Sequence, residues 1–148
     1  MIIYSVGCEY AIQALTRLAG LVPPGKYCLL RDILDGTDLP SHFVGKIFQS
    51  LVRYEILDSA KGRGGGFALC RPPAKITLRQ VVEAIDGVSR RKRCFLGFSD
   101  CDDHPECPNH RRCDRMRDQI DDLLDGTNLA QLVRMTAESP SRRKRKRR

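Results

Sequence analysis

Apolar residues recur at helical spacing along the first fifty residues of the chain. Between residues 5 and 21 they return at steps of three and four, which predicts an amphipathic helix that ends before Pro23 and Pro24. A shorter helix is expected around residues 29–34, and Pro40 begins a longer helix that runs to about Tyr54. The apolar stripe of the first helix consists of Tyr10, Ala11, Ala14, Leu15, Leu18 and Ala19.

The helix that begins at Pro40 has two chemically different faces. Its buried face is expected to consist of Phe43, Ile47 and Leu51, flanked by Val44 and Phe48. The opposite face carries hydrogen-bonding side chains, namely Ser41, His42, Lys46, Gln49 and Arg53. A helix of this kind buries one side and offers polar groups on the other.

The pattern changes to two short apolar runs after this helix. Residues 56–60 and 67–70 surround the turn KGRGGG, which predicts a β-hairpin with a basic, glycine-rich tip. Thr77 and Gln80 have the spacing of a capping box, and the helix that follows them is expected to stop at Gly87. Three helices followed by a hairpin predict a mainly α fold, the winged helix-turn-helix, with the hairpin as its wing.

The distribution of charge favours a polyanionic partner. The chain has 26 Lys and Arg against 18 Asp and Glu, and residues 1–93 hold 14 of the basic residues but only 8 of the acidic ones. A basic folded unit with this order of elements favours double-stranded DNA. The candidates are Ser41, His42, Lys46 and Gln49 for the major groove, with Lys61 and Arg63 for the minor groove or the phosphates. A solvated helix face and a flexible turn are the alternative.

Other classes of protein are excluded by pattern. The turn KGRGGG lacks the order G-x-x-x-x-G-K-[ST], so it does not predict a nucleotide-binding loop. The sequence shows no combination of nucleophile, base and orienting group that would predict an enzyme. No apolar run approaches the roughly 18 to 20 residues that cross a bilayer, and the first residues lack the features of a signal peptide. We therefore expect a cytoplasmic protein with no membrane partner.

Four of the seven cysteines are concentrated in one polar segment. Cys94, Cys101, Cys107 and Cys113 fall within 20 residues, and in a cytoplasmic chain such a group indicates metal or cluster ligation before disulfides. Thiolates suit both iron–sulfur clusters and zinc, and His110 can complete either site. The wide spacing, without a C-x-x-C pair, favours a cluster over zinc. Free thiols on a polar loop are the alternative.

A further helix is expected after Cys107, with a narrow apolar stripe. Cys113, Met116, Ile120 and Leu123 recur at steps of three, four and three, the pattern of a helix that packs against a partner helix. We expect these four residues to form a dimer interface, with ordinary intramolecular core as the alternative. A two-fold symmetric dimer matches a palindromic operator.

These residues resemble the bacterial Rrf-two family of winged-helix transcription regulators over about residues 4–136. The resemblance rests on GCEYAIQAL near the start, LDSAKGRGGGFAL in the wing, ITLRQVVEAIDG after it, the three spaced cysteines, and TNLAQLV near the end. It implies a homodimeric DNA-binding regulator with an iron–sulfur cluster near the start of its dimerisation helix. A 2Fe–2S cluster is favoured, and a 4Fe–4S cluster is possible.

The resemblance also implies a set of cluster ligands. Cys94, Cys101 and Cys107 match the three cysteines of the family, and His110 falls where some members have a histidine ligand. Glu9 is the rival fourth ligand, because other members donate a carboxylate from this position to the cluster of the partner subunit. Cys113 falls where many relatives have a bulky apolar residue, which agrees with an interface position.

We expect four parts along the chain. These are a winged helix-turn-helix domain over residues 1–90, a cluster-binding loop over 91–110, a dimerisation helix and final helix over 111–138, and a disordered basic tail over 139–148. The tail is expected to add salt-dependent, non-specific affinity for DNA. Assembly of the cluster, its oxidation, or its loss to oxidants or nitric oxide would switch operator affinity, so the regulator would sense redox state, iron or nitric oxide. The alternatives are a zinc-stabilised regulator without redox sensing and a small iron–sulfur electron carrier.

Overall fold

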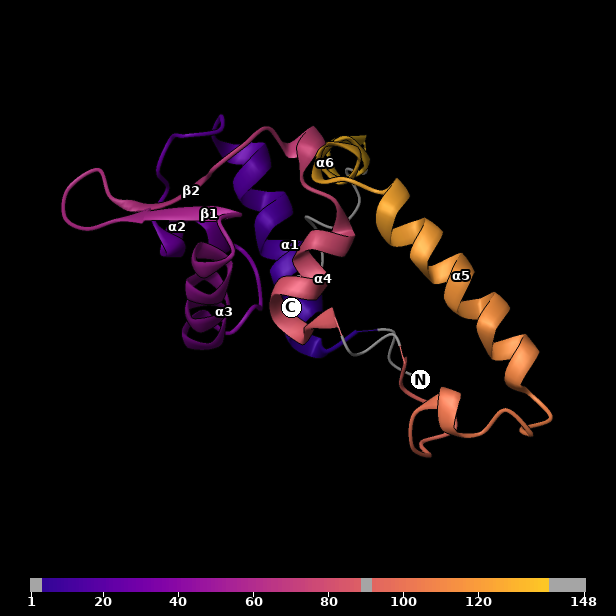
Figure 1. Cartoon of the computed structure of the whole chain (residues 1–148). Coiled ribbons are helices and arrows are strands. Elements are labelled where there is room, and N and C mark those ends of the chain that lie inside the picture. The colour runs from indigo at the N-terminus through magenta and orange to yellow at the C-terminus, as the bar shows by residue number, and fades with distance from the viewer. Residues whose placement is uncertain (1–3, 89–91, 139–148) are drawn as a thin grey trace, which may run out of the picture.

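The computed structural model describes residues 4–88 and 92–138. Its elements are α1 (Val6–Leu21), α2 (Leu30–Leu34), α3 (Ser41–Arg53), β1 (Leu57–Ala60), β2 (Gly66–Leu69), α4 (Leu78–Asp86), α5 (His110–Gly126) and α6 (Leu129–Glu138). Figure 1 shows the hairpin and α3 on one side of the molecule and α5 on the other. This order confirms the predicted mainly α fold with a hairpin wing, whereas the basic tail over 139–148 lies outside the described residues.

The start of α1 is joined to the end of α4. Ser5 caps α1 by accepting a hydrogen bond from the backbone N–H of Cys8 at 3.2 Å. Asp86, the last residue of α4, accepts from the Ser5 backbone N–H at 2.7 Å and from the Ser5 hydroxyl at 2.5 Å. Gly87 then ends α4 with a φ of 79°, as the sequence predicts. Two helices that are distant in sequence thus share one capping site.

The main core lies between α1, α3 and the hairpin. The rings of Phe48 and Phe67 meet edge to face with centroids 5.1 Å apart, which packs α3 against β2. Leu15 and Leu18 of α1 are fully buried in the same cluster. The apolar stripe predicted for the first helix therefore forms one wall of this core.

The prediction for the buried face of α3 is wrong at one position. The residues of this helix that are buried are Val44, Ile47, Phe48 and Leu51. Phe43, by contrast, is 43% exposed. It lies in the first turn of α3, at the edge of the core, where its ring meets Tyr10 edge-on at 5.8 Å. Helical spacing identifies the inward face but not the point where a helix extends past its core.

The glycines of the wing are required by backbone geometry. Cys28 lies beside β2 and exchanges two backbone hydrogen bonds of 2.9 Å with Phe67. A Cβ atom on Gly66, whose φ is 118°, would collide with the backbone carbonyl of Cys28. Gly62 and Gly64 have φ of 82° and 71° and form the tip of the hairpin. The glycines of KGRGGG therefore permit a backbone conformation that other residues would adopt only with strain.

Both α4 and α6 begin with a reciprocal cap. Thr77 accepts from the backbone N–H of Gln80 at 3.3 Å, and the Gln80 side chain accepts from the Thr77 N–H at 3.0 Å, which confirms the predicted capping box. Asn128 and Gln131 repeat this arrangement at the start of α6, with distances of 2.7 and 3.0 Å. The polar residues at these positions thus fix where both helices start.

The start of α6 returns the chain to the winged body. The Leu78 N–H donates to the carbonyl of Thr127 at 2.9 Å, and the Leu129 N–H donates to the carbonyl of Ile76 at 3.0 Å. Leu129 is fully buried in the main core, and α6 packs along α1. The final helix is therefore part of the winged body in space, although it follows α5 in sequence.

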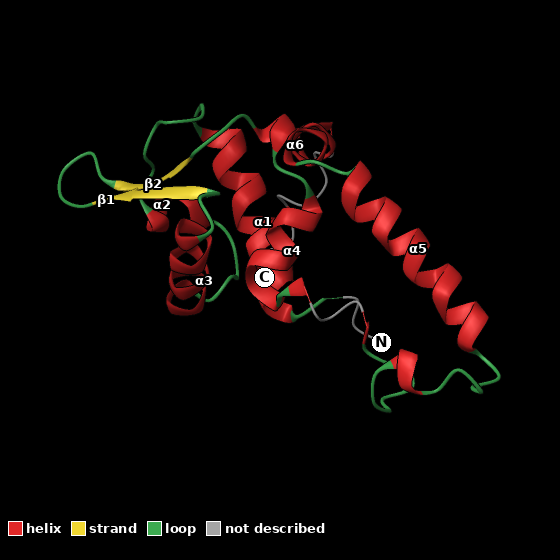
Figure 2. Cartoon of the chain, in the orientation of Figure 1, coloured by secondary structure: helices red, strands yellow, loops and turns green. Residues whose placement is uncertain are grey.

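The C-terminal half of α5 is the part that is anchored to this body. Leu124 is buried in a second apolar cluster with Cys8, Leu78 and Val82, and Ile120 packs against it. The N-terminal half and the loop before it extend away from α4, as Figure 2 shows. None of the helices in residues 4–88 and 92–138 is long and apolar enough to cross a bilayer.

Candidate functional site

The polar face of α3 points to solvent as the sequence predicts. Ser41, His42, Lys46 and Gln49 are all exposed, while the opposite face is buried in the core. The short helix α2 precedes α3 across a turn, so the two helices form a helix-turn-helix. An exposed helix with several donors on one face matches the width and the chemistry of the DNA major groove.

The wing lies on the same side of the molecule as α3. Its tip carries the exposed residues Lys61 and Arg63, each next to a glycine with positive φ. Figure 1 shows the hairpin extending beyond the helical body, opposite to α5. An exposed basic tip on the same side as α3 has the charge that contacts with phosphates or with a narrow minor groove require.

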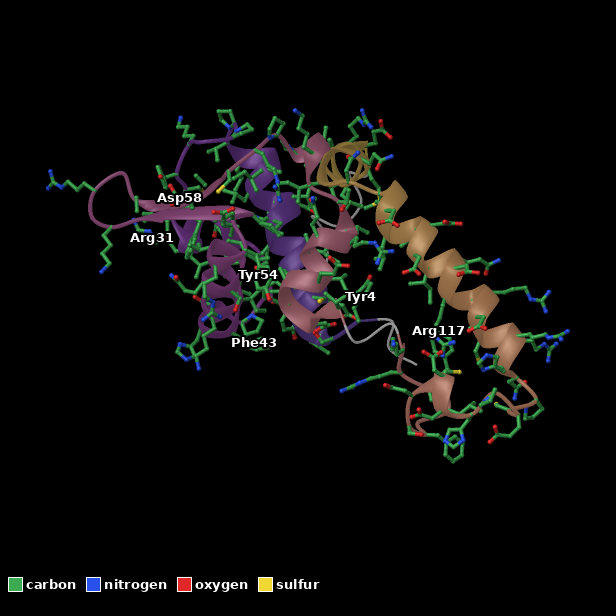
Figure 3. The ribbon with its side chains drawn as sticks, in the orientation of Figure 1. Tyr4, Arg31, Phe43, Tyr54, Asp58 and Arg117 are labelled. Atoms are coloured by element: carbon green, nitrogen blue, oxygen red, sulfur yellow. The ribbon has the colours of Figure 1, made fainter. Side chains whose placement is uncertain are left out.

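Arg31 is a basic residue of this surface that the sequence prediction missed. It lies on α2, its side chain is 82% exposed, and its Nε is 3.7 Å from a carboxylate oxygen of Asp32. In Figure 3 Arg31 is labelled beside the hairpin, at the end of the molecule that also carries α3. The first helix of a helix-turn-helix crosses the DNA backbone, so an arginine in this helix was the available signal.

The predicted cysteine ligands lie in the loop that leads into α5. Cys101 is buried, and Cys94 and Cys107 are partly buried; none of them forms a disulfide. Cys101 Sγ lies 3.8 Å from Nδ1 of His110. Within residues 4–88 and 92–138, no three His, Cys, Asp or Glu side chains lie close enough together to hold a metal ion. The structure thus pairs two predicted ligands and leaves the other two thiols nearby in the loop.

Backbone donors surround the thiol of Cys94. The backbone N–H of Leu96 donates to Cys94 Sγ at 3.3 Å. This bond, with further N–H groups of Phe98 and Gly97, lowers the pKa of Cys94 below its usual value because each favours the thiolate. A lowered pKa increases the fraction of Cys94 that is present as the thiolate, which is the form that binds metal ions.

His110 belongs to a series of polar contacts along the first turns of α5. Its Nε2 lies 3.4 Å from a carboxylate oxygen of Asp114, one helical turn further along α5. The other carboxylate oxygen of Asp114 accepts from Arg117 Nη1 at 3.0 Å. Burial alone lowers the pKa of Arg117, but the nearby sulfur of Cys101 and the Asp114 carboxylate outweigh it, so the pKa of Arg117 is raised. Cys101, His110, Asp114 and Arg117 therefore form one connected group.

The second histidine of this loop is engaged elsewhere. His104 Nε2 lies 2.8 Å from the hydroxyl of Ser99, and its Nδ1 lies 3.3 Å from a carboxylate oxygen of Glu106. Both ring nitrogens therefore have protein partners within the exposed part of the loop. His110 Nδ1 lies 3.8 Å from the Cys101 thiol, whereas the partners of His104 are oxygen atoms, so His110 is better placed to share a metal site with the cysteines.

The four residues predicted for a dimer interface have different environments. Cys113 is buried in its own chain, and burial followed by the charge of the nearby Cys101 raises its pKa. Ile120 is partly buried against the winged body. Met116 and Leu123 are 41% and 54% exposed. The structure thus places Cys113 with the cysteine loop and leaves two apolar side chains of α5 open. The rival ligand Glu9 is exposed on the first turn of α1.

Arg79 connects α4 to α5 and was missed by the sequence analysis. Its Nη2 lies 2.8 Å from a carboxylate oxygen of Asp121, its Nε donates to Asp125, and its Nη1 lies 3.7 Å from Glu83. The hydrogen bonds to Asp125 and then to Asp121 raise the pKa of Arg79. One guanidinium therefore holds two carboxylates of α5 against the winged body. Asp121 and Asp125 are one turn apart on α5, a spacing visible in the sequence, but their partner is not.

Comparison with known proteins identifies the family. The Rrf2 family, described as an iron-dependent transcriptional regulator, matches residues 4–135. A protein of Aquifex aeolicus named as an HTH-type transcriptional regulator is 27% identical over 133 residues, 88% of this chain and 91% of the relative. The transcriptional regulator IscR of Aliivibrio salmonicida is 26% identical over 130 residues, 84% of this chain and 73% of the relative.

Solved structures share the fold. The structure of CymR, the global cysteine regulator of B. subtilis, has a TM-score of 0.70 and 21% identity, and the match covers 91% of this chain and 98% of that one. The family consists of transcriptional regulators and not of enzymes, which confirms the prediction of a non-enzymatic protein. With a helix-turn-helix, a wing and a family match over residues 4–135, the chain belongs to the Rrf2 family of DNA-binding transcription regulators.

Proposed function

We propose that this Rrf2-family regulator binds a palindromic operator as a homodimer and that an iron–sulfur cluster in its cysteine loop sets its affinity for DNA. One observation supports the DNA half most strongly: the exposed polar face of α3 stands beside a folded basic wing. One observation supports the cluster half most strongly: Cys101 Sγ and His110 Nδ1 are 3.8 Å apart where the loop enters α5.

The DNA-contacting residues have separate roles in this proposal. Ser41, His42 and Gln49 offer hydrogen bonds to base edges, and Lys46 adds a positive charge to the same face of α3. Lys61 and Arg63 of the wing, with Arg31 of α2, contact the phosphate backbone or an adjacent minor groove. The side chains of α3 specify sequence, while those of the wing and α2 fix register and add salt-dependent affinity.

By chemical type, the donor set of the loop suits an iron–sulfur cluster, and Cys101 and His110 are the pair of donors that already lie close together. Cys94, Cys101 and Cys107 supply three thiolates, and His110 is the proposed fourth ligand. The Nε of Arg117 is buried and has no hydrogen-bond partner among the described residues, so an anionic group bound at the neighbouring thiols would give it an acceptor. When bound, the cluster supplies one-electron redox chemistry and reactivity toward oxidants and nitric oxide.

The path from the loop to DNA runs through α5 and α4. The loop is continuous with the N-terminal half of α5, and Arg79 holds the C-terminal half against α4. Helix α4 in turn packs against α1 and α3. A change in the order of the loop would therefore alter the position of α5 in the dimer and, through α4, the spacing of the two recognition helices.

The DNA half is tested with probes selected by the wild-type protein from a random double-stranded library. The variants Lys46→Ala and Arg63→Ala are titrated against the selected probe and a scrambled probe at several salt concentrations, with Lys75→Ala, a change at an exposed lysine, as matched control. We expect Lys46→Ala to lose affinity for the selected probe by about tenfold or more, a cost of roughly 1–3 kcal/mol. Equal loss for Lys75→Ala, or no preference for the selected probe, would contradict the proposal.

The cluster half is tested on protein purified without oxygen. We expect a brown protein with iron and sulfide in equal amounts, a spectrum that is lost in Cys94→Ala, Cys101→Ala and Cys107→Ala, and an affinity for the selected probe that differs between loaded and metal-free forms. Cys70→Ala, a change at an exposed thiol outside the loop, should keep both metal and spectrum. A colourless protein with about one zinc per chain would instead support a zinc-stabilised regulator without redox sensing.

A further inference from the structure

The first turns of α5 carry three side chains at the spacing of one helix face, and all three contact the cysteine loop or one another. His110, Asp114 and Arg117 are separated by four and three residues. Asp114 lies between the other two, 3.4 Å from His110 Nε2 and 3.0 Å from Arg117 Nη1. His110 Nδ1 lies 3.8 Å from Cys101 Sγ. The row thus extends from the buried cysteine through histidine and aspartate to arginine.

Arg117 holds the loop against α5. Its side chain is only 10% exposed. Its Nη2 donates to the carbonyl of Arg93 at 3.3 Å, and its guanidinium carbon lies 5.0 Å from the centre of the Phe95 ring. Figure 3 shows Arg117 on the side of α5 that faces the loop. One guanidinium therefore contacts residues on both sides of Cys94 as well as the helix that carries His110.

A surface ion pair does not account for this arrangement. The other arginines of the same stretch of α5, Arg111, Arg112 and Arg115, are exposed. Burial of a guanidinium is costly unless anionic or polar groups surround it, and the groups that surround Arg117 are the Asp114 carboxylate, a backbone carbonyl, an aromatic face and the sulfur of Cys101. A buried cation next to a thiol lies where it can stabilise negative charge on sulfur.

We propose that Asp114 and Arg117 are positioning residues of the cluster site: Asp114 orients the imidazole of His110, and Arg117 holds a positive charge against Cys101 and secures the loop. A carboxylate behind a ligating histidine fixes the ring orientation and strengthens the ligand. A fixed cation beside a cluster stabilises its more negative, reduced form. This inference rests on the proposed cluster function, and the following experiment separates the two.

The test of Arg117 is the midpoint potential of the protein purified with its cluster, measured by dithionite titration. Arg117→Met removes the cation and should lower the potential, changing the ratio of reduced to oxidised protein at a fixed potential by about tenfold, or about 59 mV for a one-electron couple. Arg117→Lys keeps the charge and should retain most of the wild-type potential. Arg115→Met removes an exposed charge from the same helix and should leave the potential unchanged.

The test of Asp114 is the rate at which a chelator removes iron from the same preparation. Asp114→Asn should lose iron about tenfold faster than wild type, because removing the carboxylate that holds a ligating histidine typically weakens metal affinity by about 10- to 100-fold. Asp122→Asn, at an exposed acidic position two turns further along α5, is the matched control and should lose iron at the wild-type rate. Circular dichroism and affinity for the selected DNA probe verify that each variant is folded.

The outcomes separate the two ideas. A wild-type protein without iron and sulfide would overturn the proposed function and this inference with it. A loaded wild-type protein in which Arg117→Met matches Arg115→Met in potential, and Asp114→Asn matches Asp122→Asn in iron loss, would overturn the inference alone. A potential that falls equally in Arg117→Met and Arg117→Lys would show that Arg117 acts by packing, which also contradicts the proposed electrostatic role.

Discussion

The thiol of Cys8 is fully buried near the start of α1, 4.0 Å from the carbonyl oxygen of Val82. Burial, followed by the nearby charge of Asp86, raises the pKa of Cys8 from 9.0 to about 12. Above pH 9 the unfolded chain releases this proton while the folded chain keeps it. The contribution of Cys8 to the free energy of unfolding is therefore complete below pH 9 and decreases as the pH rises toward 12.

This residue makes the stability of the protein sensitive to alkaline pH. Between about pH 9.5 and pH 10.5, Cys8 should lower the free energy of unfolding by up to about 1.4 kcal/mol per pH unit. Urea unfolding of wild type and Cys8→Ala at about pH 7.5, 9.5 and 10.5 measures this effect. The variant is expected to be less stable at neutral pH, because it leaves a cavity, and to show a shallower decline at high pH. Parallel declines in the two proteins would show that Cys8 does not titrate as described.

Gly66 of the wing is a position where any other residue conflicts with the fold. Its φ is 118°, and a Cβ atom would collide with the backbone carbonyl of Cys28. Gly64, two residues earlier, has a φ of 71° but open space around it. Gly66→Ala should lower the free energy of unfolding by about 3 kcal/mol or more and weaken DNA binding, whereas Gly64→Ala should cost only about 1–2 kcal/mol. Urea unfolding of the two variants compares these costs, and equal values would contradict the proposed collision.

At the scale of elements, the contact between α4 and α5 joins the helix that follows the cysteine loop to the winged body. Arg79 bonds Asp121 and Asp125 on α5 while it belongs to α4. The Arg79 side chain is only one-quarter exposed, so solvent screens this contact less than an open surface pair. The apolar contacts of Leu124 also hold α5 against the winged body. The contacts of Arg79 with Asp121 and Asp125 therefore fix the orientation of α5 but are not its whole attachment.

A double-mutant cycle tests the strength of this connection. Arg79→Met, Asp121→Asn and the double variant should give a coupling energy of about 1 kcal/mol in urea unfolding at low salt, decreasing as salt is added. The pair of Arg31 and Asp32, whose side chains are largely exposed, should give a coupling close to zero in the same experiment. If the coupling energy of Arg79 with Asp121 is no larger than that of Arg31 with Asp32, the arginine does not link α4 firmly to α5.

At the scale of the whole molecule, the N-terminal half of α5 extends away from the winged body, and the side chains of Met116 and Leu123 on this helix are exposed. Helix–helix interfaces are commonly formed by apolar side chains that repeat along one side of each helix. We expect the wild-type protein to sediment at twice its chain mass of 16.7 kDa. The double substitution Met116→Asp with Leu123→Asp should give monomers and abolish tight binding to a palindromic probe.

Met135 on α6 provides the matched control, because it is a comparably exposed apolar residue on a different helix. Met135→Asp should leave the sedimenting mass and the affinity for DNA unchanged. A dimer that persists in the α5 variant and dissociates in the α6 variant would place the interface on α6 and refute the assignment to α5.

Much of the fold could be predicted from the chain alone. The capping box at Thr77 and the stop at Gly87 lie where they were predicted, and the strands of the glycine-rich hairpin lie within one residue of their predicted bounds. The exception on the buried face of α3 was Phe43, because periodicity does not show where a core ends. In the candidate site, the cysteines and His110 stood out by residue type, whereas Asp114 and Arg117 resembled ordinary charged residues of a surface helix.

The helices, the hairpin and the chemical character of the loop follow from the order of residues along the chain, because helical period, capping and glycine conformation depend on residues within a few positions of one another. Tertiary structure alone decided that Asp86 supports the cap of α1, that α6 returns to pack on α1, and that Arg79 joins α4 to α5. These contacts link residues that lie tens of positions apart. Their energies depend on distance in space, which local sequence does not encode.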